Sequence, residues 1–286
     1  IQPAPLTTDG RFNLLRTLLL GSDRSNVYVI DEQGSITFSS MLLFSGFQLL
    51  PSIWQLSPTN ELRKIVQEGD TAPGFENGVF TRIIAENFHP WGAFLSVTPS
   101  GDVVFFSPVM VDDGPDGPWN GIWRDSGTGL EALVRSGDPT PLGDGTVFQL
   151  DRLENRFIFP LTVNPRGDVG FGAYALHADA QQSIDRIGYW VLRDSHTLSA
   201  VTWSEPAPGM PGLIFGWMDP AHRPSAISDN GSVAVTPYNL LESLDNSESE
   251  RSGVWVSDGL AAELIAQTSE RSLPISPCVF RSAVGL

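Results

Sequence analysis

The feature of this sequence that most constrains its fold is a four-residue segment ending in glycine that occurs four times. The copies are residues 31–34, 98–101, 164–167 and 228–231, and their glycines are 67, 66 and 64 residues apart. Apolar residues alternate after each copy, as Val169 and Phe171 do after Gly167. Such a segment predicts a β-hairpin in which a polar residue opens a type I turn and the glycine takes the left-handed position of a bulge.

Two further landmarks recur with the same period. A tryptophan follows each turn, at Trp54, Trp123, Trp190 and Trp255, with spacings of 69, 67 and 65 residues. A turn-like segment comes next, at 69–74, 137–141 and 204–209, with a degenerate copy at 269–270. Apolar segments then begin near Phe12, Phe80, Phe148, Phe215 and Phe280. Several landmarks in one order and with one period identify an internal repeat.

The repeat predicts an all-β fold, a β-propeller of four four-stranded antiparallel blades of about 67 residues each. Each unit offers a strand near the Phe, one around the turn glycine, the Trp strand and its partner. The predicted units of this single repeat domain, residues 1–286, are 12–79, 80–147, 148–214 and 215–279. Residues 280–286 are then a closing strand or a truncated fifth blade. A row of β-sandwich modules is the alternative, for which such units are small.

The cut between the first two strands of a unit is left open by the sequence. Pro90, Pro160 and Pro224 fall in that connection, and proline is confined to strand edges and bends. In an up-and-down blade the connections alternate between the two ends of the sheet. We therefore expect this connection at the end of the sheet where a turn joins the Trp strand to its partner. The connection between the strand that follows the turn glycine and the Trp strand is expected at the opposite end.

Composition excludes several classes of partner and site. The net charge is −16 and the 17 basic residues are scattered, whereas nucleic acid is held by clustered Lys and Arg. No apolar stretch approaches the roughly 18 residues of a membrane span. Cys278 is the only cysteine, so the chain has neither an internal disulfide nor a cysteine-based zinc site. The chain begins at Ile1 without a leader, and we expect any targeting signal to lie outside it.

The landmarks resemble those of a bacterial tandem-repeat family described by its NxxGxxAF motif. Residues 69–74, residues 164–171 and the Gly-x-Trp strands carry the resemblance, while Asp31 and Thr98 stand where the motif has Asn, and at the fourth turn the Asn has moved to Asn230. The resemblance implies an exported protein, extracellular or on the cell surface, of unknown function. The C-terminal sorting anchor that such proteins often carry is missing from this sequence. Because the motifs read as structural, the resemblance implies no catalytic residue.

Non-repeating residues are the candidates for function, because the fold explains the repeated ones. One group occupies equivalent connections in successive units, 8 to 14 positions before each turn glycine: His89, Trp91, Arg156, Trp217, Asp219, His222 and Arg223. Loops on a rigid scaffold are where binding groups concentrate, so this group is a candidate site for a sugar or an anionic small molecule. The alternative, which the residue types favour, is that the tryptophans fill gaps between blades and the polar side chains cap turns.

Acidic residues give two weaker candidates. Asp112, Asp113 and Asp116 lie in one insertion, and Ca²⁺ takes carboxylate and carbonyl oxygens; a solvated acidic loop is the favoured alternative, and no other cofactor is expected. Asp70, Asp138, Glu205 and Glu270 repeat with the period. They either form a ring of carboxylates that binds a cation or, as their turn context favours, accept hydrogen bonds from the backbone of their own turns.

The sequence therefore predicts a non-enzymatic exported binding or scaffold protein whose partner is a glycan or a surface protein. It lacks the G-x-S-x-G, H-E-x-x-H, P-loop and G-x-G-x-x-G signatures. The alternative is a carbohydrate-active propeller enzyme, a glycoside hydrolase or lyase, using a carboxylate pair or a His near the axis. A structural component of a surface layer is the third hypothesis.

Overall fold

The chain forms antiparallel β-sheets. The computed structural model describes residues 11–12, 28–43, 49–81, 95–111, 119–150, 161–177, 186–194, 196–216, 226–237, 240–242, 247–249, 251 and 253–267. Every regular element in these ranges is a β-strand, and every strand pair among them is antiparallel. The prediction of an all-β protein built from antiparallel sheets is confirmed.

The strands fall into four successive units. Unit 1 contains β1 (Arg11–Phe12), β2 (Tyr28–Ile30), β3 (Ile36–Leu43), β4 (Leu49–Leu56) and β5 (Leu62–Gln67). Unit 2 contains β6 (Gly78–Phe80), β7 (Leu95–Val97), β8 (Val103–Val111), β9 (Trp119–Asp125) and β10 (Leu130–Arg135). Unit 3 contains β11 (Thr146–Gln149), β12 (Thr162–Val163), β13 (Val169–His177), β14 (Arg186–Arg193) and β15 (His196–Thr202).

Unit 4 is divided between two sheets. It contains β16 (Leu213–Phe215), β17 (Ala226–Ile227), β18 (Val233–Val235), β19 (Leu240–Glu242), β20 (Ser247–Ser249), β21 (Gly253–Ser257) and β22 (Ala262–Gln267). One sheet has the order β16-β19-β20 and the other β17-β18-β21-β22. The long strand of the other units, such as β13, is thus represented by β18 and β19. Pro237, which has no backbone N–H to donate, lies between them.

The first strand of each unit is interrupted, which differs from the sequence-based expectation. In unit 2, β6 pairs with the far end of β8, with Phe80 opposite Val109, and β7 pairs with its start, with Leu95 opposite Phe105. The Phe segment and the segment before the turn therefore lie end to end on one edge of the same strand. The reason is geometric: the turn pairs the preceding segment with only the first half of β8, which leaves its second half to the Phe segment.

The glycine-ended turns are the predicted hairpins. Gly34, Gly101, Gly167 and Gly231 have φ values of 85°, 91°, 86° and 83°, where a Cβ atom would be strained. In each turn the glycine N–H donates to the carbonyl three residues before it, at 2.8–3.0 Å. The first side chain closes the turn in the same way as a backbone group would, as when Asn164 Oδ1 accepts from the N–H groups of Arg166 and Asp168.

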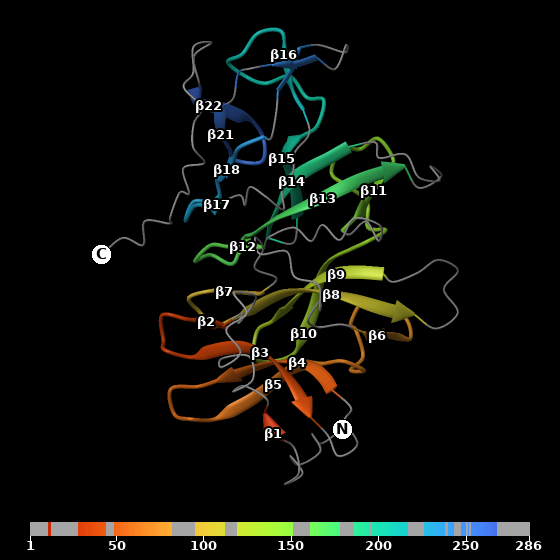
Figure 1. The fold of residues 1–286 in the computed structure, drawn as a ribbon, viewed down its shortest axis with the longest axis vertical. Coiled ribbons are helices and arrows are strands. Elements are labelled where there is room, and N and C mark those ends of the chain that lie inside the picture. Colours follow the sequence, from red (N-terminus) through yellow and green to blue (C-terminus); the bar gives the residue numbers. More distant parts are fainter. Residues whose placement is uncertain are drawn as a thin grey trace.

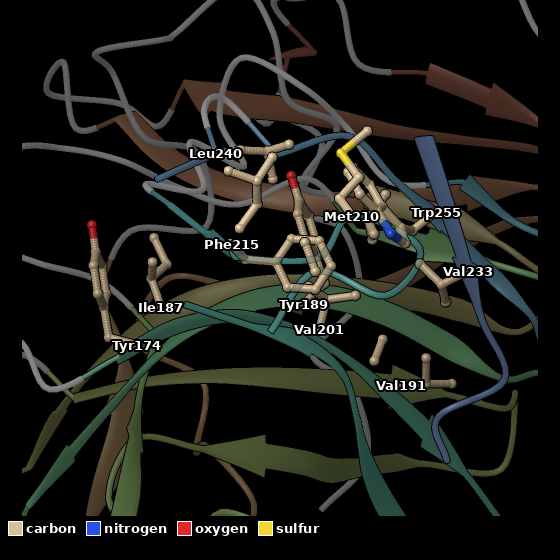
Figure 2. Close-up of a cluster of buried hydrophobic side chains, with 14 residues drawn as sticks. Tyr174, Ile187, Tyr189, Val191, Val201, Met210, Phe215, Val233, Leu240 and Trp255 are labelled. Atoms are coloured by element: carbon tan, nitrogen blue, oxygen red, sulfur yellow. The ribbon is translucent and has the colours of Figure 1, made fainter. Parts of the chain in front are cut away.

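The hydrophobic core lies between units. Alternate residues of a strand face opposite sides of the sheet, and in β14 Tyr189 and Val191 pack against unit 4 while Trp190 and Leu192 belong to the core shared with unit 2. Figure 2 shows the cluster between units 3 and 4, to which both units contribute. Because both faces of β8, β13 and β14 are covered, these strands have almost continuous buried runs instead of alternation.

The repeated Phe and Trp side chains contact each other in the hydrophobic cores of units 2, 3 and 4. The ring centroids of Phe80 and Trp123 are 4.9 Å apart with the planes at 73°. The equivalent rings of Phe148 and Trp190 are 5.0 Å apart at 89°, and those of Phe215 and Trp255 are 5.0 Å apart at 82°. Edge-to-face contact is a favourable geometry for aromatic rings, so the periodic aromatics are explained by packing.

The four units follow one another along the longest axis of the molecule, with unit 1 at the bottom of Figure 1 and unit 4 at the top. The hydrophobic clusters of the described residues join unit 1 to unit 2, unit 2 to unit 3 and unit 3 to unit 4. The closure of the units into a four- or five-bladed propeller ring therefore stays a prediction. The proposed closing segment, residues 280–286, lies outside the described residues.

Candidate binding surface

The residues that the sequence singles out for binding lie outside the described part of the chain. His89 and Trp91 fall in 82–94, Arg156 falls in 151–160, and Trp217, Asp219, His222 and Arg223 fall in 217–225. Asp112, Asp113 and Asp116 fall in 112–118. The structure fixes the residues on either side of these four connections, and these flanking residues show where each connection leaves its sheet.

The first group of connections leaves from the middle of a sheet edge. Phe80 and Leu95, the strand residues before and after residues 82–94, pair with Val109 and Phe105 of β8. In unit 3 the strand residues that flank 151–160 lie within one residue of the same positions, since Gln149 pairs with Tyr174 and Thr162 with Gly170 of β13. We expected this connection at the end of the sheet that bears the Trp-hairpin turn. The flanking pairs place its start and finish partway along the strand, because β6 and β7 share one edge.

The strands that follow these connections form one column. β2 contacts β7, β7 contacts β12 and β12 contacts β17, and Figure 1 shows the four short strands following one another along the left side of the molecule. Leu95 and Leu161, which follow the connections of units 2 and 3, are buried in the cores between units. The connections of units 2 and 3 therefore start from similar points on neighbouring units, whereas in unit 4 the strands before and after the connection, β16 and β17, belong to different sheets.

Hydrogen bonds join the turns of neighbouring units. Gln33 Nε2 donates to the carbonyl of Pro99 at 2.9 Å, from the first turn to the second. Asn164 Nδ2 donates to the carbonyl of Ser228 at 3.0 Å, from the third turn to the fourth. These bonds join the first turn to the second and the third turn to the fourth, so the side chains of Gln33 and Asn164 help to hold neighbouring units together.

The residues that flank the acidic insertion, residues 112–118, lie at the opposite end of unit 2. Val111, its preceding residue, pairs with Gly78, and Trp119, its following residue, pairs with Val109. Val111 is the last residue of β8, so the flanking residues agree with the expectation that this connection leaves at the end of the sheet opposite to the first one. No group of three or more His, Cys, Asp or Glu suited to a metal ion occurs within the described ranges.

The periodic carboxylates cap their own turns. Asp70 Oδ2 accepts from the Gln67 N–H at 2.8 Å, and Asp138 Oδ2 accepts from the Arg135 N–H at 2.8 Å. Glu205 Oε2 accepts from the Thr202 N–H at 3.0 Å. Lys64 and Arg135 further pair with Asp70 and Asp138. The turn-capping interpretation is confirmed for these three; Glu270 lies outside the described residues.

Within the described ranges, two carboxyl groups of turns have shifted pKa values. The hydroxyl of Thr146 donates to Asp144 at 2.6 Å, which lowers the pKa of Asp144, helped by the Thr146 N–H and the nearby Arg186 and opposed by burial. The N–H groups of Ala261 and Leu260 lower the pKa of Asp258. Both causes are local turn hydrogen bonds, so neither carboxyl is held protonated for acid catalysis at neutral pH.

Sequence reasoning missed an ion pair between units 1 and 2. Arg63 on β5 pairs with Asp125 on β9, whose side chain is almost fully buried. The second guanidinium nitrogen of Arg63 donates to Gln55 Oε1 at 2.7 Å, and Gln55 Nε2 reaches the carbonyl of Gly101 at 3.3 Å. One signal was available: the position of Asp125 opposite Val103 is held by Leu56 and Leu192 in units 1 and 3.

The comparisons with known proteins give a family but no activity. The family model described as "Family of unknown function (DUF7453)" matches residues 16–268. No curated protein matches the chain. Across the ranges that the structure describes, no helix is long and apolar enough to cross a membrane.

Proposed function

We propose that this chain, which belongs to the DUF7453 family of unknown function, is a non-enzymatic exported scaffold that binds a glycan or a surface protein. The carrying observation is the column of contacting strands that follows the three non-repeating connections, together with the similar anchoring of the first two of them. Variable segments on equivalent points of a rigid framework are the usual way in which a scaffold presents binding groups. The resemblance to exported bacterial repeat proteins supports a place outside the cell.

The composition of the three connections supports a glycan-type ligand. They carry Trp91 and Trp217, His89 and His222, and Arg156. Aromatic faces pack against the apolar faces of sugars, and imidazole and guanidinium groups donate to hydroxyl and carboxylate oxygens. Ca²⁺ is a further proposal for Asp112, Asp113 and Asp116, because clustered carboxylate oxygens are ligands that this ion takes.

Thermal melting with a panel of glycans tests the proposal. A ligand that binds only the folded state raises the midpoint by mass action. We expect a neutral or acidic glycan to raise the midpoint of the wild type, and the double variant His89→Ala/Trp91→Ala to lose most of that shift. His196→Ala is the matched control, because His196 is exposed on β15 of unit 3, outside the three connections. An unchanged shift in the double variant would refute the proposed surface.

The calcium proposal and the enzyme alternative are separated in the same experiment. A midpoint that rises with CaCl₂ and falls back with EDTA, and that no longer responds in the triple variant Asp112→Asn/Asp113→Asn/Asp116→Asn, supports the cation site. Release of new reducing ends or unsaturated products from a bound glycan would replace the scaffold function by the carbohydrate-active enzyme.

The closed propeller is the compact alternative for the arrangement of the same four units. Small-angle X-ray scattering distinguishes the two, because a ring has a smaller maximum dimension than four units in a row. Pair-distance distributions that match the elongated arrangement of Figure 1 would exclude ring closure in solution.

A further inference from the structure

The inner units of the molecule are covered on both faces, whereas each end unit has one open face. In unit 2, Val103 and Phe105 belong to the core shared with unit 1, and Val104 and Phe106 to the core shared with unit 3. The burial of β8 is accordingly almost continuous. In unit 4, β21 alternates between buried and half-buried residues, which is the pattern of a sheet with one covered face.

In units 2, 3 and 4 one side of the sheet packs against the preceding unit. In unit 1 the same side of the sheet is open. Leu95 in unit 2 and Leu161 in unit 3 lie three residues before the first residue of their turns and are 3% and 4% exposed. Tyr28 occupies this position in unit 1 and is 59% exposed; Ile30, two residues further on the same side of β2, is 58% exposed. We call Tyr28, Ile30, Ile36 and Phe38 the N-terminal end face; the last two are half-buried.

The open face of unit 4 is the other half of the same interface. Ile265 is the bulged residue of β22 opposite Val254 and Trp255, the position that Ile65 holds on β5 opposite Ile53 and Trp54. Ile65 is 8% exposed in the core between units 1 and 2, and Ile265 is 58% exposed. We call Val254, Val256 and Ile265 the C-terminal end face.

The glycine-ended turns also differ between the end unit 4 and the other units. The first turn residues of units 1 to 3, Asp31, Thr98 and Asn164, are buried, and Asn164 donates directly to the turn of the next unit. Ser228, the first turn residue of unit 4, is exposed. No turn of a following unit covers Ser228 among the described residues, whereas the equivalent residues of units 1 to 3 are buried.

We propose that a second copy of this chain covers these faces, with the C-terminal end face of one copy packed on the N-terminal end face of the next. The contact would continue the interface that already joins units 1 to 2, 2 to 3 and 3 to 4, with the same aliphatic and aromatic chemistry. One copy cannot join its own two end faces in this arrangement, because units 1 and 4 lie at opposite ends of the longest axis (Figure 1). A heterologous contact of this kind builds rings or filaments.

This inference deepens the proposed scaffold function and names its partner. Sedimentation velocity of the full chain over a concentration series tests it. We expect the weight-average mass of the wild type to rise with concentration to at least twice the 31.0 kDa of one chain. The variants Tyr28→Ser/Ile30→Lys and Ile265→Lys should each remain monomeric, because each lacks one half of the contact. Met110→Lys, at a side chain 56% exposed on inner unit 2, should associate as the wild type does.

An equimolar mixture of the two end-face variants gives the decisive result. Each variant keeps the half that the other has lost, so the mixture should form a dimer of one copy of each and nothing larger. Self-association of Ile265→Lys alone would show that the N-terminal end faces pair with each other and would overturn the head-to-tail contact. A wild type that is monomeric at its highest soluble concentration would overturn the proposal altogether. Glycan binding is measured separately on the monomeric variants, so the failure of either idea is distinguishable from failure of the other.

Discussion

The side-chain amide of Asn164 donates to the carbonyl of Ser228 at 3.0 Å and so bonds the turn of unit 3 to the turn of unit 4. Asp31 occupies the same position in unit 1, and its Oδ1 accepts from the N–H groups of Gln33 and Ser35. Its other oxygen, Oδ2, is buried and has no hydrogen-bond partner. A carboxylate cannot donate to a neighbouring carbonyl, whereas an amide of the same shape can.

Asp31→Asn should therefore stabilise the protein. The new amide would donate to the turn of unit 2 as Asn164 does to that of unit 4, and a buried unpaired oxygen would be removed. We expect the free energy of unfolding to rise by about 1 kcal/mol, measured by urea denaturation. Asn164→Asp is the reverse control and should lower it. Equal stability of Asp31→Asn and the wild type would show that the first two turns are not joined as the last two are.

A second stabilising change lies in the turn that follows unit 3. Ser204 has a φ of 70°, a left-handed value at which the equivalent turns of units 1 and 2 have Gly69 and Gly137. An L-residue with a Cβ is strained there by roughly 1–2 kcal/mol. Ser204→Gly should raise the free energy of unfolding by about half of that strain, since glycine also gains freedom in the unfolded chain.

Gly69→Ser is the matched control for this substitution. A Cβ at Gly69 meets no atom within 4 Å, so the backbone conformation alone should destabilise the variant. The two effects are compared by thermal and urea unfolding. If Ser204→Gly is less stable than the wild type, the left-handed conformation is not a source of strain in this turn.

The pair of Arg63 and Asp125 gives a third prediction, about the interface between units 1 and 2. Arg63→Ala leaves a buried carboxylate without its cation and should lower the free energy of unfolding by about 1–3 kcal/mol; the value stays moderate because Arg63 is 37% exposed. The double variant Arg63→Ala/Asp125→Leu should regain stability, because leucine fills the equivalent positions 56 and 192. A double variant less stable than Arg63→Ala would refute this account.

The fourth prediction concerns pH. The pKa of Asp144 is lowered in the folded state, chiefly by the hydroxyl of Thr146. Its contribution to stability is therefore present above the unfolded-state pKa of about 3.9 and is lost as the pH falls through the lower folded-state pKa. Thr146→Val should raise the pKa of Asp144, followed by NMR of the carboxyl carbon, and flatten the loss of stability between about pH 4 and 2.

Thr128→Val serves as the control for that titration. Thr128 shares a hydrogen bond with Ser126 in an exposed turn and has no carboxylate partner. It should leave the titration of Asp144 unchanged. A pKa of Asp144 that is the same in Thr146→Val and in the wild type would assign the shift to the backbone N–H and Arg186 instead.

The sequence by itself determined the local structure of this protein. The period of the turn glycines, the tryptophans and the carboxylates at 70, 138 and 205 predicted the hairpins, the aromatic landmarks and the turn caps. These features depend on residues close together in the chain, where backbone conformation and hydrogen bonding follow directly from residue type. The candidate binding residues were selected because they break the repeat, and in units 2 and 3 their flanking strands lie at nearly equivalent places.

Only the tertiary structure decided how the pieces share their edges and faces. β6 and β7 lie on one edge of β8, Arg63 reaches Asp125 across a boundary between units, and Tyr28 and Ile265 are exposed where their counterparts are buried. Residue spacing reports which side of a strand a residue occupies, but not whether another sheet covers that side. Coverage is a property of how whole units pack, and it separates an open row with two end faces from a closed ring built from the same blades.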